Sequence, residues 1–231
     1  IVKMDGDNQM DSIYLSELIV PIINNDCDYS KGNRFHHFSE LLKMPKIRLF
    51  GNSLLSFFVK FSSGYWDISD PTNGYIAVSG STLKLIDLEN LSRGYFFEIK
   101  LLIEANIKNL VIEEIKMPAK YDGEISSLNI SKTVLVFPFL LLKGLFKRIL
   151  YKYFIYSFNL GSIYLLFGLP LFLFGVLFGI INWYKYSSLN SFTPTGTIVI
   201  SLLTIILGFQ LLIQAITFDV ITSPKNKYDR K

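Results

Sequence analysis

The chain has 231 residues, half of them hydrophobic, and a formal net charge of +4. Its charges are so unevenly distributed that no single class of soluble protein fits: between Lys152 and Asp219 the only charged side chain is Lys185. The cations gather beside this apolar region, which favours contact with a membrane surface over nucleic-acid binding. Cys27 is the only cysteine, which excludes an intrachain disulfide and fits a reducing compartment.

The N-terminal residues predict the end of a buried strand over 1–4, followed by an acidic turn over 5–11. A helix is predicted from Ser12, with Asp11 or Ser12 as its cap. Because proline lacks the backbone N–H of a helix, Pro21 is expected to break or restart this helix.

The next segment, 25–44, is predicted to be rich in loops. A helix is predicted to begin at Pro45 and to stop at Gly64, because apolar residues recur between them at intervals of three and four. Residues 70–74 form a predicted turn, and a short strand over 75–78 leaves it. The adjacent His36 and His37 are interpreted as loop residues, since neighbouring side chains rarely point at one metal.

A second helix is predicted over 96–105, and a strand over 110–117 that ends before Pro118. Residues 120–127 are polar. The part of the chain before the apolar region therefore mixes helices and strands, which predicts an α/β fold.

Residues 132–153 predict an amphipathic helix that begins at Pro138. Its apolar side chains share one face, and its cations, which would meet lipid phosphates, share the other. A helix packed on the soluble domain is the alternative. The cations are Lys143, Lys147, Arg148 and Lys152.

Two uncharged stretches, 153–184 and 186–218, each exceed the roughly 20 residues that a helix needs to cross a membrane. Both lie too far along the chain to be signal peptides. Cations precede the first stretch and follow the second, whereas the linker between them carries only Lys185. Because Lys and Arg near span ends stay on the cytoplasmic side, both termini are expected to be cytoplasmic.

Asp5, Asp7 and Gln9 alternate in the acidic turn after the first strand. Such a turn directs several hard oxygen ligands at one Mg²⁺ or Mn²⁺, and a solvated acidic turn is the alternative. The same residues match the first ligand positions of an EF-hand, but that loop needs Gly and Glu where this chain has Met10 and Ser16. A calcium loop is therefore excluded.

Six ordered blocks stand out along the chain. They are Asp5-x-Asp7-x-Gln9, Lys31-Gly32-Asn33-Arg34-Phe35, Ser63-Gly64-Tyr65-Trp66, Asp70-Pro71-Thr72-Asn73-Gly74-Tyr75, Tyr95-Phe96-Phe97-Glu98 and Lys120-Tyr121-x-Gly123-Glu124-x-Ser126-Ser127. Together they resemble the family 2 glycosyltransferases that act on polyprenyl phosphates, the group typified by dolichol-phosphate mannose synthase. The resemblance runs over nearly the whole chain, and the paired C-terminal spans match one subgroup.

The resemblance implies a role for each matched residue. Asp5, Asp7 and Gln9 would hold the metal, and Asp70 would lie near the acceptor as a base or, as we expect, an orienting group. The remaining matched candidates would bind phosphate or line the site. Arg34, Lys120 and Ser126 are the phosphate-binding candidates, and Glu98 and Trp66 are further site candidates. Lys120 stands where the family pattern leads us to expect Arg, so it lacks the bidentate fork. Asp70 as a capped turn residue and Glu98 as a structural carboxylate remain alternatives.

The resemblance also implies a GT-A fold that is only partly present. The chain opens on Ile1 rather than Met, so the natural N-terminus and half of the donor site are expected to lie upstream. The expected domains are the C-terminal part of the catalytic domain (1–130), membrane-interface helices (131–157), two transmembrane helices (158–220) and a cytoplasmic tail (221–231).

The expected activity is an inverting, metal-dependent sugar transfer from a nucleotide-sugar donor to a polyprenyl-phosphate acceptor at the cytoplasmic membrane face, in cell-envelope glycan biosynthesis. Its expected partners are these two substrates and the lipid bilayer, without nucleic acid, and homo-oligomerisation stays open. A processive polysaccharide synthase is one alternative, although the Gln-x-x-Arg-Trp pattern common in that class precedes neither Trp66 nor Trp183. A non-catalytic membrane anchor or lipid-carrier partner is the other.

Overall fold

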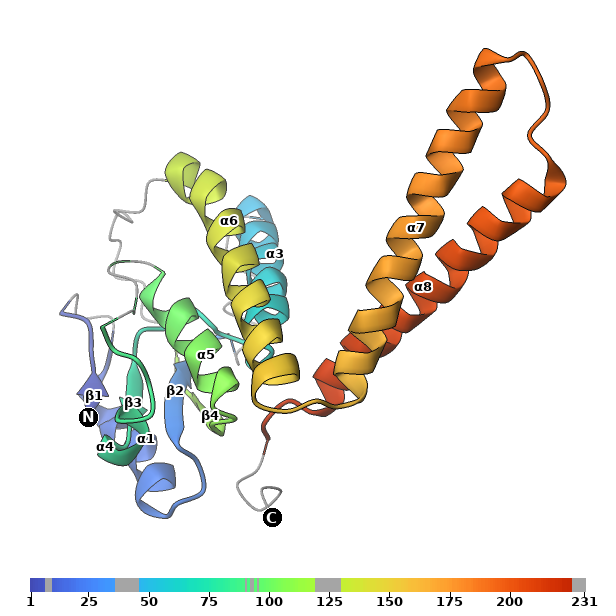
Figure 1. Ribbon diagram of the computed structural model, residues 1–231. Coiled ribbons are helices and arrows are strands. Elements are labelled where there is room, and N and C mark those ends of the chain that lie inside the picture. The colour runs from blue at the N-terminus through green and yellow to red at the C-terminus, as the bar shows by residue number, and fades with distance from the viewer. Residues whose placement is uncertain are drawn as a thin grey trace. The chain divides into compact units, whose positions relative to one another are not determined.

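The computed structural model of the chain describes residues 1–6, 10–35, 46–89, 91, 94, 96–118 and 130–225, with the backbone alone for 46–49, 52 and 130–134. The chain divides into two compact units (Figure 1). The first comprises 1–150 and 223–231, and the second 151–222.

The first unit holds a four-stranded sheet in the order β1-β3-β2-β4. Strands β1 and β2 both run antiparallel to β3, and β2 runs parallel to β4. The carboxyl ends of β1, β2 and β4 therefore meet the beginning of β3 at one edge of the sheet. Ligands of α/β proteins bind outside the carboxyl ends of strands, so this edge is the first place to look for a site. The strands are β1 (Val2–Lys3), β2 (Tyr29–Asn33), β3 (Ile76–Val78) and β4 (Ile112–Lys116).

Helices of the first unit pack on the sheet and on one another. Helix α1 contacts β2, β3 and β4, and its Leu18 is buried in a core cluster with Tyr75, Ala77 and Met117. Helices α3, α5 and α6 pack together and lie side by side in Figure 1. The helices are the 3₁₀ turn η1 (Ser12–Tyr14), α1 (Leu15–Ile23), α3 (Lys46–Ser63), α4 (Gly80–Leu83), α5 (Phe97–Ile107) and α6 (Ile130–Ile149).

Cations on one face of α6 bind other helices of the first unit. The buried Arg148 donates from Nε to the Ser62 carbonyl at 2.9 Å and from Nη2 to the Phe61 carbonyl at 3.1 Å. It thus satisfies carbonyls that the end of α3 leaves without helical partners. Lys147 donates to Glu104 of α5 at 2.5 Å. The prediction that these cations meet lipid phosphates is therefore wrong for Arg148, and Lys147 is paired within the unit.

The opposite face of α6 is apolar and exposed. Its large side chains recur at helical spacing and have more than half of their surface accessible, up to 80% for Leu135. The neighbouring α3 exposes apolar side chains as well, including Phe50 and Phe57. Such a face is typical of a helix that contacts a membrane or a partner. On α6 it consists of Leu135, Phe139, Leu142, Phe146 and Leu150 at the end of the helix.

The second unit is a helical hairpin preceded by a π-helical turn. Both long helices are long and apolar enough to cross a membrane. They pack closely through glycines: a Cβ added to Gly208 would lie 2.4 Å from the backbone nitrogen of Phe172, and one added to Gly175 would lie 2.8 Å from that of Ile205. The elements are η2 (Leu150–Ile155), α7 (Leu160–Ser188) and α8 (Thr195–Ile221).

The strand predicted as buried, β1, is only half-buried, and Ile1 before it is 80% exposed. Three further predicted elements differ from the structure in place or extent. Strand β2 lies inside the segment that was predicted to be loop-rich, because its sequence, Tyr-Ser-Lys-Gly-Asn, lacks an apolar pattern. Helix α1 continues through Pro21 to Ile23, since a proline in the last turn removes few hydrogen bonds. Helix α6 begins at Ile130 and passes through Pro138 rather than beginning there.

Candidate functional site

The acidic turn begins at the carboxyl end of β1, where Asp5 shares a lysine with α5. Lys3 donates from Nζ to Asp5 Oδ1 at 2.6 Å and to Glu98 Oε1 at 3.0 Å. Burial alone would lower the pKa of Lys3, but hydrogen bonds to the two carboxylates and their charges raise it above its usual value. Asp5 and Glu98 are therefore brought together around one permanent cation.

The turn before β3 lies directly against Asp5. A Cβ added to Gly74 would be 2.5 Å from Asp5 Oδ2 and 2.8 Å from Lys3 Nζ. Any larger residue at this position would push the carboxylate and the ammonium away. The sheet edge thus places the acidic turn beside the turn 70–74 that carries Asp70.

Asp70 is fully buried and is bound by Arg34, which follows β2. Its Oδ2 accepts from the backbone N–H of Arg34 at 3.1 Å and from Nε at 2.8 Å, and its Oδ1 accepts from Nη2 at 3.1 Å. This is the bidentate geometry that fixes a guanidinium most firmly. The arginine side chain itself remains 30% exposed, so it can meet a ligand.

Lys31 of β2 lies beneath the same turn. It is fully buried and donates from Nζ to the backbone carbonyl of Asp70 at 2.5 Å. Burial lowers the pKa of Lys31 to about 8, against the opposing effect of the Asp70 and Glu114 carboxylates. The carbonyl and the side chain of Asp70 are therefore each held by a different basic residue.

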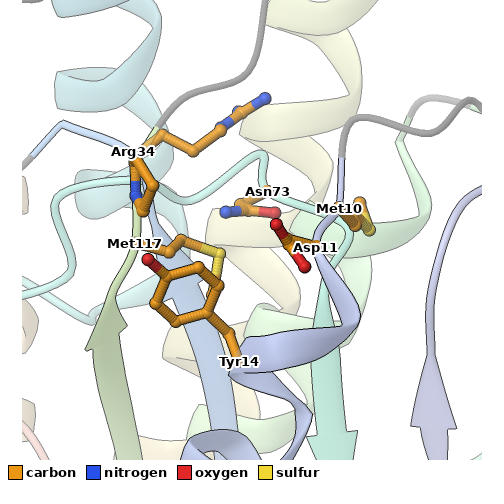
Figure 2. Close-up of a pocket in the computed structure, with 7 residues that line it drawn as sticks. Met10, Asp11, Tyr14, Arg34, Asn73 and Met117 are labelled. Atoms are coloured by element: carbon orange, nitrogen blue, oxygen red, sulfur yellow. The ribbon is translucent and has the colours of Figure 1, made fainter.

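A pocket opens between these elements at the sheet edge (Figure 2). The buried Asn73 has a fixed orientation because its Oδ1 accepts from the N–H of Tyr75 at 3.0 Å. Its Nδ2 has no hydrogen-bond partner among the described residues, and Figure 2 shows it on the side of Arg34 and Met117. The pocket therefore offers a guanidinium, an amide donor and a carboxylate. The described lining is Met10, Asp11, Tyr14, Arg34, Asn73, Met117 and Pro118.

Comparison with known proteins gives a relative with a named activity. Over 120 residues, 52% of this chain and 47% of the relative, the chain is 31% identical to a protein of Methanococcus voltae named UDP-N-acetylglucosamine--dolichyl-phosphate N-acetylglucosaminyltransferase. The chain is similar to a dolichyl-phosphate sugar transferase. It is also 27% identical over 121 residues, 49% of the relative, to an uncharacterised protein of Methanocaldococcus jannaschii. The chain spans about half the length of these curated relatives, and no family model matches it.

Some of the predicted site residues contact charged neighbours in the structure, and others lie outside the described residues. Asp5 and Glu98 share Lys3, and Asp70 holds Arg34. Trp66 packs edge-to-face on Phe61 with the ring centroids 6.0 Å apart, and it is not among the described residues that line the pocket. Asp7, Gln9, Lys120 and Ser126 lie outside the described residues, as do His36 and His37.

Asp11 and Asn73 line the pocket, although the sequence pointed to neither as a ligand-binding residue. Asp11 was predicted to cap a helix, and it does so by accepting from the N–H of Ile13 at 3.1 Å. Asn73 lies in the predicted turn 70–74, and the sequence assigned it no role in ligand binding. The sequence contained one indication of both residues: each is polar and lies inside or close to a block that resembles the glycosyltransferase family.

Proposed function

We propose that the full-length protein transfers a sugar, with inversion, from a nucleotide-sugar donor to a polyprenyl phosphate at the cytoplasmic face of a membrane. The observation that carries this proposal is the Arg34–Asp70 pair at a pocket beside Asp5, in a chain similar to a named dolichyl-phosphate sugar transferase. An anionic acceptor and a diphosphate donor both require cationic groups at such a site.

In this proposal Arg34 binds a phosphate group of the donor or acceptor, and Asp70 orients Arg34. Asp70 is buried, and both of its carboxylate oxygens already accept N–H groups of Arg34, an arrangement that fixes the guanidinium. An acceptor phosphate is already ionised near neutral pH and needs positioning more than deprotonation. Asp70 is therefore proposed as a positioning residue, and Lys120 and Ser126 as further phosphate ligands.

Mg²⁺ or Mn²⁺ is proposed as the cofactor, held by Asp5, Asp7 and Gln9. Of these three, only Asp5 lies within the described residues, where its side chain is 44% exposed and its Oδ1 accepts from the ammonium of Lys3. A metal ion bound there would have to replace this ammonium. Hard divalent ions take carboxylate and amide oxygens of this kind. When bound, the ion would offset negative charge on the leaving diphosphate.

The membrane part of the proposal concerns the placement of the site. Helices α7 and α8 are proposed as the anchor, with both termini cytoplasmic, and the apolar face of α6 is proposed to lie in the lipid interface. The face ends at Leu150, ten residues before α7 begins at Leu160.

The direct test is transfer of a radiolabelled sugar from nucleotide donors to polyprenyl phosphate by the full-length protein in membranes, with Mg²⁺, Mn²⁺ or chelator. Asp7→Asn is expected to lower transfer at least about a hundredfold, because the turn loses a metal-binding charge. Asp26→Asn, a change of the same type at an exposed aspartate, should leave it unaltered. Wild-type turnover by Asp7→Asn would refute the metal assignment, and polymeric products would favour the processive synthase.

A further inference from the structure

Glu114 of β4 is hydrogen-bonded both to the turn that carries Asp70 and to the end of β2, directly before Arg34. Its Oε1 accepts from the backbone N–H groups of Ser69 and Asp70, each at 2.9 Å. Its Oε2 accepts from Nδ2 of Asn33 at 2.8 Å. One carboxylate thus satisfies three donors, two of them beside the turn that carries Asp70 and one at the end of β2.

The sheet register explains why Glu114 reaches these groups. In the parallel pair, Glu114 lies beside Lys31 and two positions before the partner of Asn33. Successive residues of a strand alternate between faces, so Lys31, Asn33 and Glu114 share one face of the sheet. That face points at the turn that carries Asp70.

Every polar group of Asp70 is consequently held. Glu114 fixes its N–H, Lys31 fixes its carbonyl, and Arg34 binds its carboxylate. Asn33, the other partner of Glu114, accepts from the N–H of Phe35 at 2.9 Å and so shapes the loop on either side of Arg34. The position of the guanidinium thus depends on Glu114 through both Asp70 and Asn33.

We propose that Glu114 is a positioning residue for phosphate binding at this site, acting through Asp70 and Asn33 without touching substrate. This inference rests on the proposed function of Arg34. Hydrogen bonds to a carboxylate are stronger and shorter than those to a neutral oxygen, so the charge of Glu114 matters as well as its shape. Its neighbour Glu113 points away from this cluster and is exposed.

Glu114→Gln is the informative variant because it keeps size while it changes one acceptor to a donor. If Oε1 is kept as the amide oxygen, the new NH₂ group faces the NH₂ group of Asn33, so two donors oppose each other. Asn33→Asp supplies the missing acceptor and keeps an oxygen for the N–H of Phe35. The double variant therefore restores the hydrogen bond between positions 33 and 114 and the total charge, with the carboxylate now at position 33 instead of position 114.

The experiment measures kcat and KM of the full-length protein for both substrates. We expect Glu114→Gln to lower kcat/KM for polyprenyl phosphate at least about tenfold, Glu113→Gln to leave it unchanged, and the double variant to recover most of the loss. A merely structural role would lower the amount of folded protein and leave kcat/KM of the folded fraction unchanged. Wild-type kcat/KM in Glu114→Gln, or a double variant worse than either single one, would overturn the inference.

Amide hydrogen exchange separates this inference from the proposed function. The N–H groups of Ser69 and Asp70 should exchange faster in Glu114→Gln and Glu114→Ala than in the wild type or Glu113→Gln. Unchanged exchange would overturn the positioning role even in an active enzyme. Absence of transfer by the wild type, with exchange altered as expected, would refute the proposed function and leave Glu114 as the residue that orders the turn that carries Asp70.

Discussion

Lys3, Lys31 and Glu114 are charged side chains to which the sequence motifs assign no individual role, and each is hydrogen-bonded to a residue of the candidate site. Lys3 joins Asp5 to Glu98, and Lys31 and Glu114 bind the two ends of the Asp70 residue. A buried charge is costly unless it is paired and hydrogen-bonded. Of the three, Lys31 is fully buried, and its hydrogen bond to the Asp70 carbonyl offsets part of the cost of that burial.

The motifs identified the conspicuous residues of the candidate site but not these supporting ones. Asp5, Arg34, Asp70 and Glu98 were named from the sequence, and the structure pairs each of them with a charged neighbour. Glu114 lies 44 residues from Asp70 along the chain, and Lys3 lies 95 from Glu98. Contacts at such separations depend on strand order and register, which residue spacing does not reveal.

The buried Lys31 should give the protein a measurable pH dependence of stability. Its pKa in the folded state is about 8, below the usual 10.5, so between these values the unfolded chain holds a proton that the folded chain has lost. Raising the pH through this window therefore favours folding, and the full desolvation cost is present below about pH 8. Lys31→Met should remove this contribution.

The measurement is the thermal unfolding midpoint of the full-length protein in detergent from pH 7 to pH 10.5. We expect the midpoint of the wild type to rise with pH relative to that of Lys31→Met. Lys84→Met, at an exposed lysine, should follow the wild type. Parallel pH profiles for the wild type and Lys31→Met would show that Lys31 does not titrate in this window.

At the scale of elements, sequence patterns found those that bury a regular apolar face or carry a clear stop signal. Helix α3 ends at Ser63, and Gly64 takes a positive φ of 75°, as its predicted role as a helix stop requires. Strand β2 escaped prediction because all of its residues are buried, including Lys31, so polar and apolar positions do not alternate. Because polar site residues occupy β2, the strand lacks the alternation of apolar and polar residues by which strands are predicted.

The hairpin of α7 and α8 depends on close approach at Gly208. Because an added Cβ would lie within 2.7 Å of two backbone atoms of Phe172, Gly208→Ala must separate the helices or shift them. We expect a loss of about 1–3 kcal/mol, as for other overpacked interiors. Gly196→Ala is the matched control, since nothing lies within 4 Å of a Cβ added there.

Thermal unfolding in detergent compares the two alanine variants. The unfolding midpoint should fall for Gly208→Ala and stay the same or rise for Gly196→Ala, where alanine favours the helix. Equal midpoints would mean that the two helices do not pack at Gly208 in the membrane.

At the scale of the whole molecule, the chain consists of a charged first unit and a second unit whose two long helices are apolar. Few residues of the two long helices are buried, at most 11% in the most apolar stretch of either helix. A soluble core helix would be buried, so this exposure is consistent with a lipid environment. The sequence alone predicted this division, because it depends on composition over long windows rather than on particular contacts.

The predicted orientation in the membrane rests on cations near the first span, two of which bind protein groups in the folded chain. Arg148 is buried in the first unit and Lys147 is paired with Glu104, yet both precede the first span and count as cytoplasmic signals while the chain is inserted. Lys185, near the end of α7, is the only cation beside the connection between the spans. The charge balance therefore predicts that this connection lies on the outer side, whatever the final contacts of the cations.

Cysteine labelling on intact cells tests this topology. In a Cys27→Ser background, Ser191→Cys, between α7 and α8, should react with a membrane-impermeant maleimide added outside. Lys84→Cys, at an exposed position of the first unit, should react only after the cells are permeabilised. The opposite labelling pattern would reverse the orientation and place Arg34 and Asp70 outside the cell, away from cytoplasmic nucleotide sugars. Labelling of both sites only after permeabilisation would show that the hairpin does not cross the membrane.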